Sequence, residues 1–166
     1  MQKTLAILNE LESAGLVESY AIGGAMAGFF YAEAVVTEDL DAFVLLKNSS
    51  GLVTLTPIYD YLKQRGATEE REHLWLAGTL LQVIPAYDAL TEEAVREAVE
   101  KTVGETKTRV MQVEHLIVIA LKTGRAKDYA RIALLLEESE VDDLRLLDIL
   151  TRHQLLDRWE KHKLKP

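Results

Sequence analysis

The sequence predicts an α+β fold, and three observations lead to it. Between residues 16 and 113, short apolar runs bounded by glycine, proline or polar turn residues alternate with helical segments. From Glu114 onward the apolar residues recur with helical spacing, which predicts a helical C-terminal third. No internal repeat, low-complexity tract or long linker separates these parts. We therefore expect a core at residues 1–106 and a last strand with C-terminal helices at residues 107–166, packed together as one unit.

The elements predicted for the first 66 residues follow from apolar spacing and turn residues. Leucines at helical spacing that end at Gly15 indicate an amphipathic first helix. The segment Asn48-Ser49-Ser50-Gly51 is typical of a loop, and Pro57 fits the first turn of a helix. The predicted elements are a helix over residues 4–14, a strand over 16–22, a helix over about 25–34, a strand over 41–47 and a helix over 57–65.

A turn signal and a helix-start signal define the elements predicted for the next segment of the chain. Gly78 separates two apolar runs and indicates a hairpin with a very tight turn. Thr91 followed by two glutamates is typical of a helix N-cap and first turn. The predicted elements are strands over residues 73–77 and 79–84, a helix from Thr91 to near Gly104, and a last strand over residues 108–113.

Charge and composition exclude several classes of function. Nineteen Lys and Arg against 27 Asp and Glu give a net charge of −8, which disfavours nonspecific binding along DNA. Cysteine is absent, which excludes a disulfide framework, a thiolate metal site and a cysteine nucleophile. Residues 1–5 lack a signal-peptide arrangement, and no apolar run approaches the roughly 18 residues of a membrane helix. We therefore expect a cytoplasmic protein without a membrane partner.

A diglycine and two nearby carboxylates predict a phosphate and metal site. Gly23 and Gly24 follow an apolar run and precede a predicted helix, so their backbone N–H groups can approach an anion closely. Asp39 and Asp41 lie one residue apart at the start of a strand and therefore share a face. Two such carboxylates suit Mg²⁺ together with substrate phosphates. The alternative is that they are solvent-facing charges at the start of an edge strand.

These residues resemble the nucleotidyltransferase superfamily, in which an apolar-Gly-Gly/Ser turn is followed by Asp-x-Asp on the next strand. The Thr-x-Asp-x-Asp form that begins at Thr37 looks most like the minimal, AbiEii-like branch associated with bacterial toxin–antitoxin systems. A later segment, Lys122-Thr123-Gly124-Arg125-Ala126-Lys127-Asp128, supports this resemblance, which covers about residues 21–136. The resemblance implies a small mixed sheet of four or five strands flanked by helices, with a C-terminal helical extension. Thr37 would bind either the turn or the nucleotide.

One position departs from the pattern of this family. Members usually carry a third carboxylate in an apolar-Asp-apolar-apolar-Pro run, and here Gln82 occupies that position. An amide offers a carbonyl oxygen to a metal ion but cannot act as a general base near neutral pH. Asp88, six residues further on, would replace the third carboxylate if the strand ends at Pro85 and the chain then turns back.

The later basic segment has two interpretations. Lys122 and Arg125 would contact a triphosphate, with Arg125 binding phosphate oxygens bidentately. Alternatively, they are exposed cations at a helix junction, where Asp128 provides the N-terminal charge of the next helix. The four histidines show no paired ligand spacing, so we expect structural or surface roles for them.

Two functions follow from the resemblance. The first is Mg²⁺-dependent transfer of a nucleoside monophosphate from an NTP to a hydroxyl of a protein or an RNA, with Asp39 and Asp41 as the catalytic and metal-binding pair and Gln82 as a further metal ligand. The second is a catalytically degenerate member that binds a nucleotide or a partner, and Gln82 favours this alternative. Whether the chain is an enzyme stays open at this point.

Overall fold

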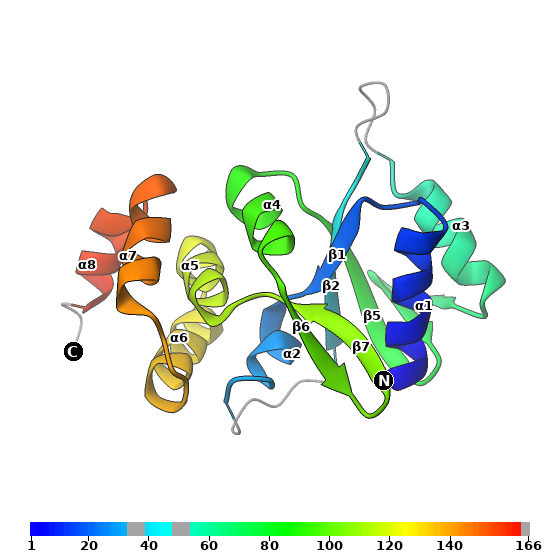
Figure 1. Cartoon of the computed structure of the whole chain (residues 1–166), viewed down its shortest axis with the longest axis horizontal. Coiled ribbons are helices and arrows are strands. Elements are labelled where there is room, and N and C mark those ends of the chain that lie inside the picture. The colour runs from blue at the N-terminus through cyan, green and yellow to red at the C-terminus, as the bar shows by residue number, and fades with distance from the viewer. Residues whose placement is uncertain (33–38, 48–53, 164–166) are drawn as a thin grey trace.

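A seven-stranded mixed sheet forms the centre of the protein, as Figure 1 shows for the computed structural model, which describes residues 1–32, 39–47 and 54–163. The strand order is β3-β4-β5-β2-β1-β7-β6. The strands are β1 (Ser19–Ile22), β2 (Asp39–Leu45), β3 (Thr68–Glu70), β4 (His73–Leu76), β5 (Thr79–Pro85), β6 (Val99–Val103) and β7 (Thr106–Val110). The helices are α1 (Gln2–Ser13), α2 (Gly24–Gly28), α3 (Thr56–Gln64), α4 (Ala89–Arg96), α5 (Val113–Thr123), α6 (Ala126–Glu138), α7 (Asp143–Arg152) and α8 (Leu156–Lys163).

The sheet combines parallel and antiparallel pairs around its central strand β2. This strand runs antiparallel to β1 and parallel to β5, and β1 in turn lies parallel to β7. Leu40, Ala42 and Val44 alternate along β2 and are almost completely buried, because their face packs into the core. The other face of β2 carries Asp39 and Asp41, which are only partly buried.

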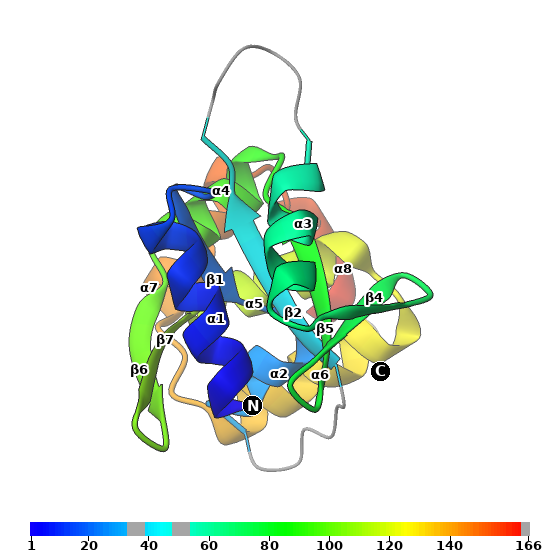
Figure 2. The ribbon, with the colours of Figure 1, turned by 90° about the vertical axis from the view of Figure 1, so that its right-hand side faces the viewer.

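Helices cover both faces of the sheet. Figure 2 shows α1 and α3 in front of the strands, and α1 buries Leu5, Leu8 and Leu11 beneath it. On the opposite face α2 and α4 contact β2, and α5 packs against both of these helices. The remaining helices lie further out, with α6 and α7 against α5 and α8 against α7 (Figure 1). Among the described residues, no helix has the length and apolar character that crossing a bilayer requires.

The predicted α+β class is confirmed, and the first hairpin is confirmed as β4 and β5. The number of strands was underestimated, since seven were found where four or five were expected. One missed strand is β3, whose Thr68-Glu69-Glu70 segment is exposed and has no apolar alternation to reveal it. The first strand and the helix after the diglycine are shorter than predicted, as β1 and α2. The predicted loop at residues 48–51 lies outside the described residues.

The predicted helix from Thr91 to near Gly104 was wrong at both ends. It begins earlier because Asp88 is the N-cap, with its Oδ1 accepting from the backbone N–H groups of Leu90 and Thr91. It ends at Arg96, and the chain then forms the β6–β7 hairpin. The sequence Val-Glu-Lys-Thr-Val of β6 has β-branched residues at both ends and beside the second, which fits a strand better than a helix. The strand β7 that follows residue 105 lies between β6 and β1.

Candidate active site

A cleft of about 790 Å³ lies between the sheet and the helices α5 and α6. Strands β2, β4 and β5 contribute side chains from the sheet, and Gly24 and Ala25 contribute from the start of α2. The charged and polar side chains that line the cleft are Asp39, Asp41, Glu72, His73, Gln82, Thr123, Arg125, Lys127, Asp128 and Arg131. The cleft thus brings together carboxylates, an amide, an imidazole and three cations.

The diglycine forms a tight corner between β1 and α2. The backbone N–H of Gly23 donates to the carbonyl oxygen of Asp41 over 2.9 Å, which joins the corner to β2. Gly24 has φ +60°, and a Cβ on Gly24 would lie 1.7 Å from Oδ2 of Asp41. The Asp41 carboxylate therefore lies directly against the Gly24 backbone, where only glycine leaves room for it. Because α2 has five residues, an anion here would depend on local N–H groups more than on a helix dipole.

The two carboxylates of β2 lie on one face, as their spacing predicted. Burial raises the pKa of Asp41; nearby Arg131 opposes this rise and nearby Asp39 adds to it. The parallel register pairs Asp41 with Gln82 on β5, so their side chains point to the same side of the sheet. Two carboxylates and an amide oxygen on one face are hard-oxygen donors, and these residues fit a divalent ion such as Mg²⁺.

Asp88 does not substitute for the missing carboxylate. Its Oδ1 caps α4, and its Oδ2 lies 3.0 Å from Nζ of Lys122. Burial alone would raise the pKa of Asp88, but hydrogen bonds from Thr91 and Lys122 hold it below its usual value. Both partners of this ion pair lie outside the lining of the cleft. The predicted contact of Lys122 with a triphosphate is therefore not supported by its position.

The cations of the cleft come from the loop before α6 and from α6 itself. Arg125 lines the cleft and is held by buried Asp128, with 2.7 Å between its Nε and Oδ2 and 3.1 Å between Nη2 and Oδ1. Lys127 and Arg131 lie one helical turn apart on α6, so both reach the same cleft. The sequence pattern singled out Arg125 but missed Arg131, whose role depends on where α6 packs. Thr37 lies outside the described residues.

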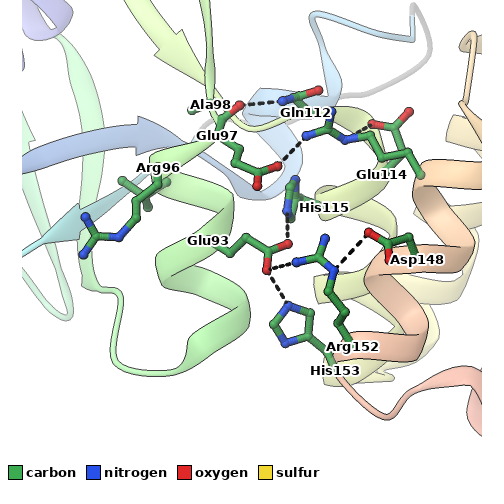
Figure 3. A network of polar contacts seen from close by, with 12 residues as sticks. Glu93, Arg96, Glu97, Ala98, Gln112, Glu114, His115, Asp148, Arg152 and His153 are labelled. Carbon is green, nitrogen blue, oxygen red and sulfur yellow. Dashed lines mark hydrogen bonds and ion pairs between the residues drawn. The ribbon is translucent and has the colours of Figure 1, made fainter.

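A second polar cluster lies away from this cleft, between α4, α5 and α7 (Figure 3). Its centre is Glu93, which accepts from His115 and His153 over 3.0 Å each and pairs with Arg152 over 2.5 Å. Burial alone would raise the pKa of Glu93, but these hydrogen bonds and the Arg152 charge lower it. Burial lowers the pKa of His115, which favours its neutral form.

The same cluster contains a carboxylate–imidazole group with ligand atoms close together. Glu93, Glu97 and His115 each offer one atom within 4.8 Å of the others. However, Glu97 pairs with Arg145 over 2.5 Å, and Arg152 holds Glu93. These carboxylates are already compensated by guanidinium groups, so the cluster is better described as a charged connection between the core and the C-terminal helices.

Comparisons with known proteins identify the fold. No protein-family model and no curated protein sequence matches the chain. The solution structure of the antibiotic-resistance factor ANT(2'')-Ia is 16% identical, with a TM-score of 0.53, over 97% of this chain and 97% of that chain. Its crystal structure with adenylyl-2''-tobramycin is 17% identical, with a TM-score of 0.51, over 95% of this chain and 98% of that chain.

A third structure agrees with these two. The crystal structure of an antigenic nucleotidyltransferase-like protein from Paracoccidioides brasiliensis is 15% identical, with a TM-score of 0.54, over 99% of this chain and 93% of that chain. Similarity at these identities establishes the architecture of the protein. The chain therefore has a nucleotidyltransferase-like fold.

Proposed function

We propose that the protein transfers a nucleoside monophosphate from an NTP to a hydroxyl acceptor, with Mg²⁺ as the metal ion. Pyrophosphate leaves as the new bond to the α-phosphorus forms, and the proton of the hydroxyl passes to solvent. The observation that carries this proposal is the placement of Gly24 directly against Asp41, in the cleft that Asp39 and the cations of α6 also line. The fold shared with ANT(2'')-Ia supports it, because one structure of that protein contains an adenylylated compound.

In this proposal each group of residues has a separate task. Asp39 and Asp41 hold the metal ion, and Gln82 offers its amide oxygen beside them. The backbone at Gly23 and Gly24 receives the phosphates. When bound, the ion neutralises charge that develops on the phosphate oxygens and aligns the attacking and leaving oxygens.

The cations of the cleft complete the phosphate site. Lys127 and Arg131 line the cleft from α6 and face the carboxylates of β2. Arg125 is oriented by its two contacts with Asp128, so its guanidinium is held in place before a ligand binds. Arg125, Lys127 and Arg131 together offset the charge of a polyphosphate.

The test is the transfer of label from an α-labelled NTP to candidate acceptors in the presence of Mg²⁺. The expected result is labelled acceptor with the wild-type chain and none with Asp41→Asn, which keeps the shape of the side chain and removes its charge. Asp60→Asn, an exposed change on α3, is the matched control and is expected to retain transfer. Equal transfer by wild type and Asp41→Asn would contradict the proposal.

Gln82 favours a second candidate function, in which the chain binds a nucleotide or a partner without catalysis. The reason is that an amide at this position cannot accept a proton from the attacking hydroxyl. Binding of Mg²⁺ and NTP without labelling of any acceptor would support this noncatalytic function. A protein or RNA acceptor and a role in a bacterial toxin–antitoxin pair are implied by the nucleotidyltransferase resemblance, and the gene neighbourhood tests that role. A cytoplasmic location stays a separate prediction from the sequence.

A further inference from the structure

Three side chains form a row across neighbouring strands on the floor of the cleft. The register pairs Asp41 on β2 with Gln82 on β5. On the other side of β5, the antiparallel register pairs Leu74 with Leu81, so the next step along β4 places His73 opposite Gln82. Residues directly opposite one another in a sheet share a face. All three side chains line the same cleft, which agrees with this register.

The histidine is close enough to influence the carboxylate. His73 lies near enough to Asp41 to contribute to the electrostatic environment of that carboxyl. Strands lie about 4.8 Å apart, so β2 and β4 are separated by about 10 Å across β5. An imidazole and a carboxylate that each form a bond of about 2 Å to one ion can span such a gap. The family pattern predicted no role for His73, since its place in the row arises from strand pairing.

We propose that His73 replaces the missing third carboxylate as a metal ligand, so that in the chain without nucleotide Asp41, Gln82 and His73 hold a divalent ion with one nitrogen in its coordination. This inference rests on the proposed function, because it concerns the ion of the same cleft. The charges of the lining agree with this inference. Four carboxylates, from Asp39, Asp41, Glu72 and Asp128, outnumber the three cationic side chains, so a bound metal cation would offset the remaining negative charge.

A nitrogen ligand changes which ion the site prefers. Mg²⁺ strongly favours oxygen ligands, whereas Mn²⁺ and later divalent ions accept imidazole more readily. An Asp–Gln–His set therefore binds Mn²⁺ more tightly than Mg²⁺ in the absence of nucleotide. When NTP is bound, its phosphates add oxygen ligands, so Mg²⁺ can still bind at Asp39 and Asp41.

The test is pulsed electron paramagnetic resonance of Mn²⁺ bound to the full chain without nucleotide. A directly bonded imidazole nitrogen produces ¹⁴N modulation of the Mn²⁺ echo. The expected result is ¹⁴N modulation in the wild type, its loss in His73→Ala and its persistence in His162→Gln. His162 is the matched control because it lies on α8 and outside the lining of the cleft. Titration calorimetry should show Mn²⁺ affinity about tenfold or more weaker in His73→Ala.

A second variant keeps the test decisive if His73→Ala does not fold. His73→Asp exchanges the nitrogen ligand for oxygen, so it should bind Mn²⁺ without ¹⁴N modulation and should gain affinity for Mg²⁺. Wild-type Mn²⁺ without a nitrogen signal would overturn the inference, as would a signal that survives in both variants.

These outcomes separate the inference from the proposed function. If Mn²⁺ binds only through oxygen and Asp41→Asn abolishes that binding, His73 is not a ligand while the proposed function stands. If neither Mn²⁺ nor Mg²⁺ binds even with NTP present, both proposals fail.

Discussion

Replacing Gly24 with alanine is expected to empty the proposed metal site while the fold persists. The added Cβ would lie 1.7 Å from Oδ2, 2.7 Å from Cγ and 3.0 Å from Cβ of Asp41. Restoring ordinary contact, about 3.5 Å, requires a displacement of about 1.8 Å. Metal–ligand distances tolerate only about 0.2 Å, so Asp41 can no longer share an ion with Asp39.

The backbone strain of the substitution alone costs less than the loss expected at the site. Gly24 has φ +60°, and alanine in the left-handed region costs about 1–2 kcal/mol. A misplacement of about 1 Å near the chemistry costs about 100-fold in rate. The Gly24→Ala chain should therefore remain folded at 25 °C, with transfer reduced at least about 100-fold.

Gly66→Ala is the matched control, because it adds the same backbone strain without a clash. Gly66 has φ +88°, and its added Cβ would meet no atom within 4 Å. Thermal unfolding should show a decrease for both variants, and the clash makes the decrease larger for Gly24→Ala, whereas calorimetry with Mg²⁺ and a nonhydrolysable NTP should show weakened binding for Gly24→Ala alone. Equal binding by the two variants would refute the steric argument.

Three further predictions concern charges outside the cleft. Glu93→Gln should lower the free energy of unfolding in urea by about 2 kcal/mol, because it weakens the contacts with His115 and Arg152; an unchanged midpoint would contradict this. The pKa of Glu93 is lowered in the folded chain, so this contribution is fully present above pH 4.5, its ordinary value, and is lost as pH falls through the folded pKa. In urea titrations, the difference in free energy of unfolding between wild type and Glu93→Gln should therefore become smaller as the pH falls. A difference that grows in acid would contradict the lowered pKa of Glu93. Asp88→Ala should cost about 1 kcal/mol as a lost N-cap and leave Mg²⁺ binding unchanged, whereas weaker Mg²⁺ binding would place Asp88 at the site.

Local sequence features predicted the parts of the site that depend on one segment. Asp39 and Asp41 share a face because side chains alternate along any strand, wherever that strand lies in the sheet. The position of Gln82 was also readable, because it lies three residues before Pro85 at the end of an apolar run. The close contact of Gly24 with Asp41 needed the pairing of β1 with β2, which the sequence alone does not specify.

The features that were missed depend on contacts between distant segments. His73 reaches the cleft through the pairing of β4 with β5, and Arg131 reaches it through the packing of α6. Lys122 belongs to the motif in sequence, but it pairs with Asp88 and lies outside the lining of the cleft. The β6 strand was predicted as helix because the helical signal of α4 was extended past Arg96 to Gly104.

In the proposed function, Asp39 and Asp41 hold a divalent ion against a polyphosphate at the glycine corner. The most direct measurement is a crystal structure of the chain with Mg²⁺ and a nonhydrolysable NTP. We predict an ion about 2.1 Å from oxygens of both carboxylates, with phosphates beside Gly24 and within reach of Lys127. A nucleotide bound elsewhere, or an ion that contacts neither carboxylate, would contradict it.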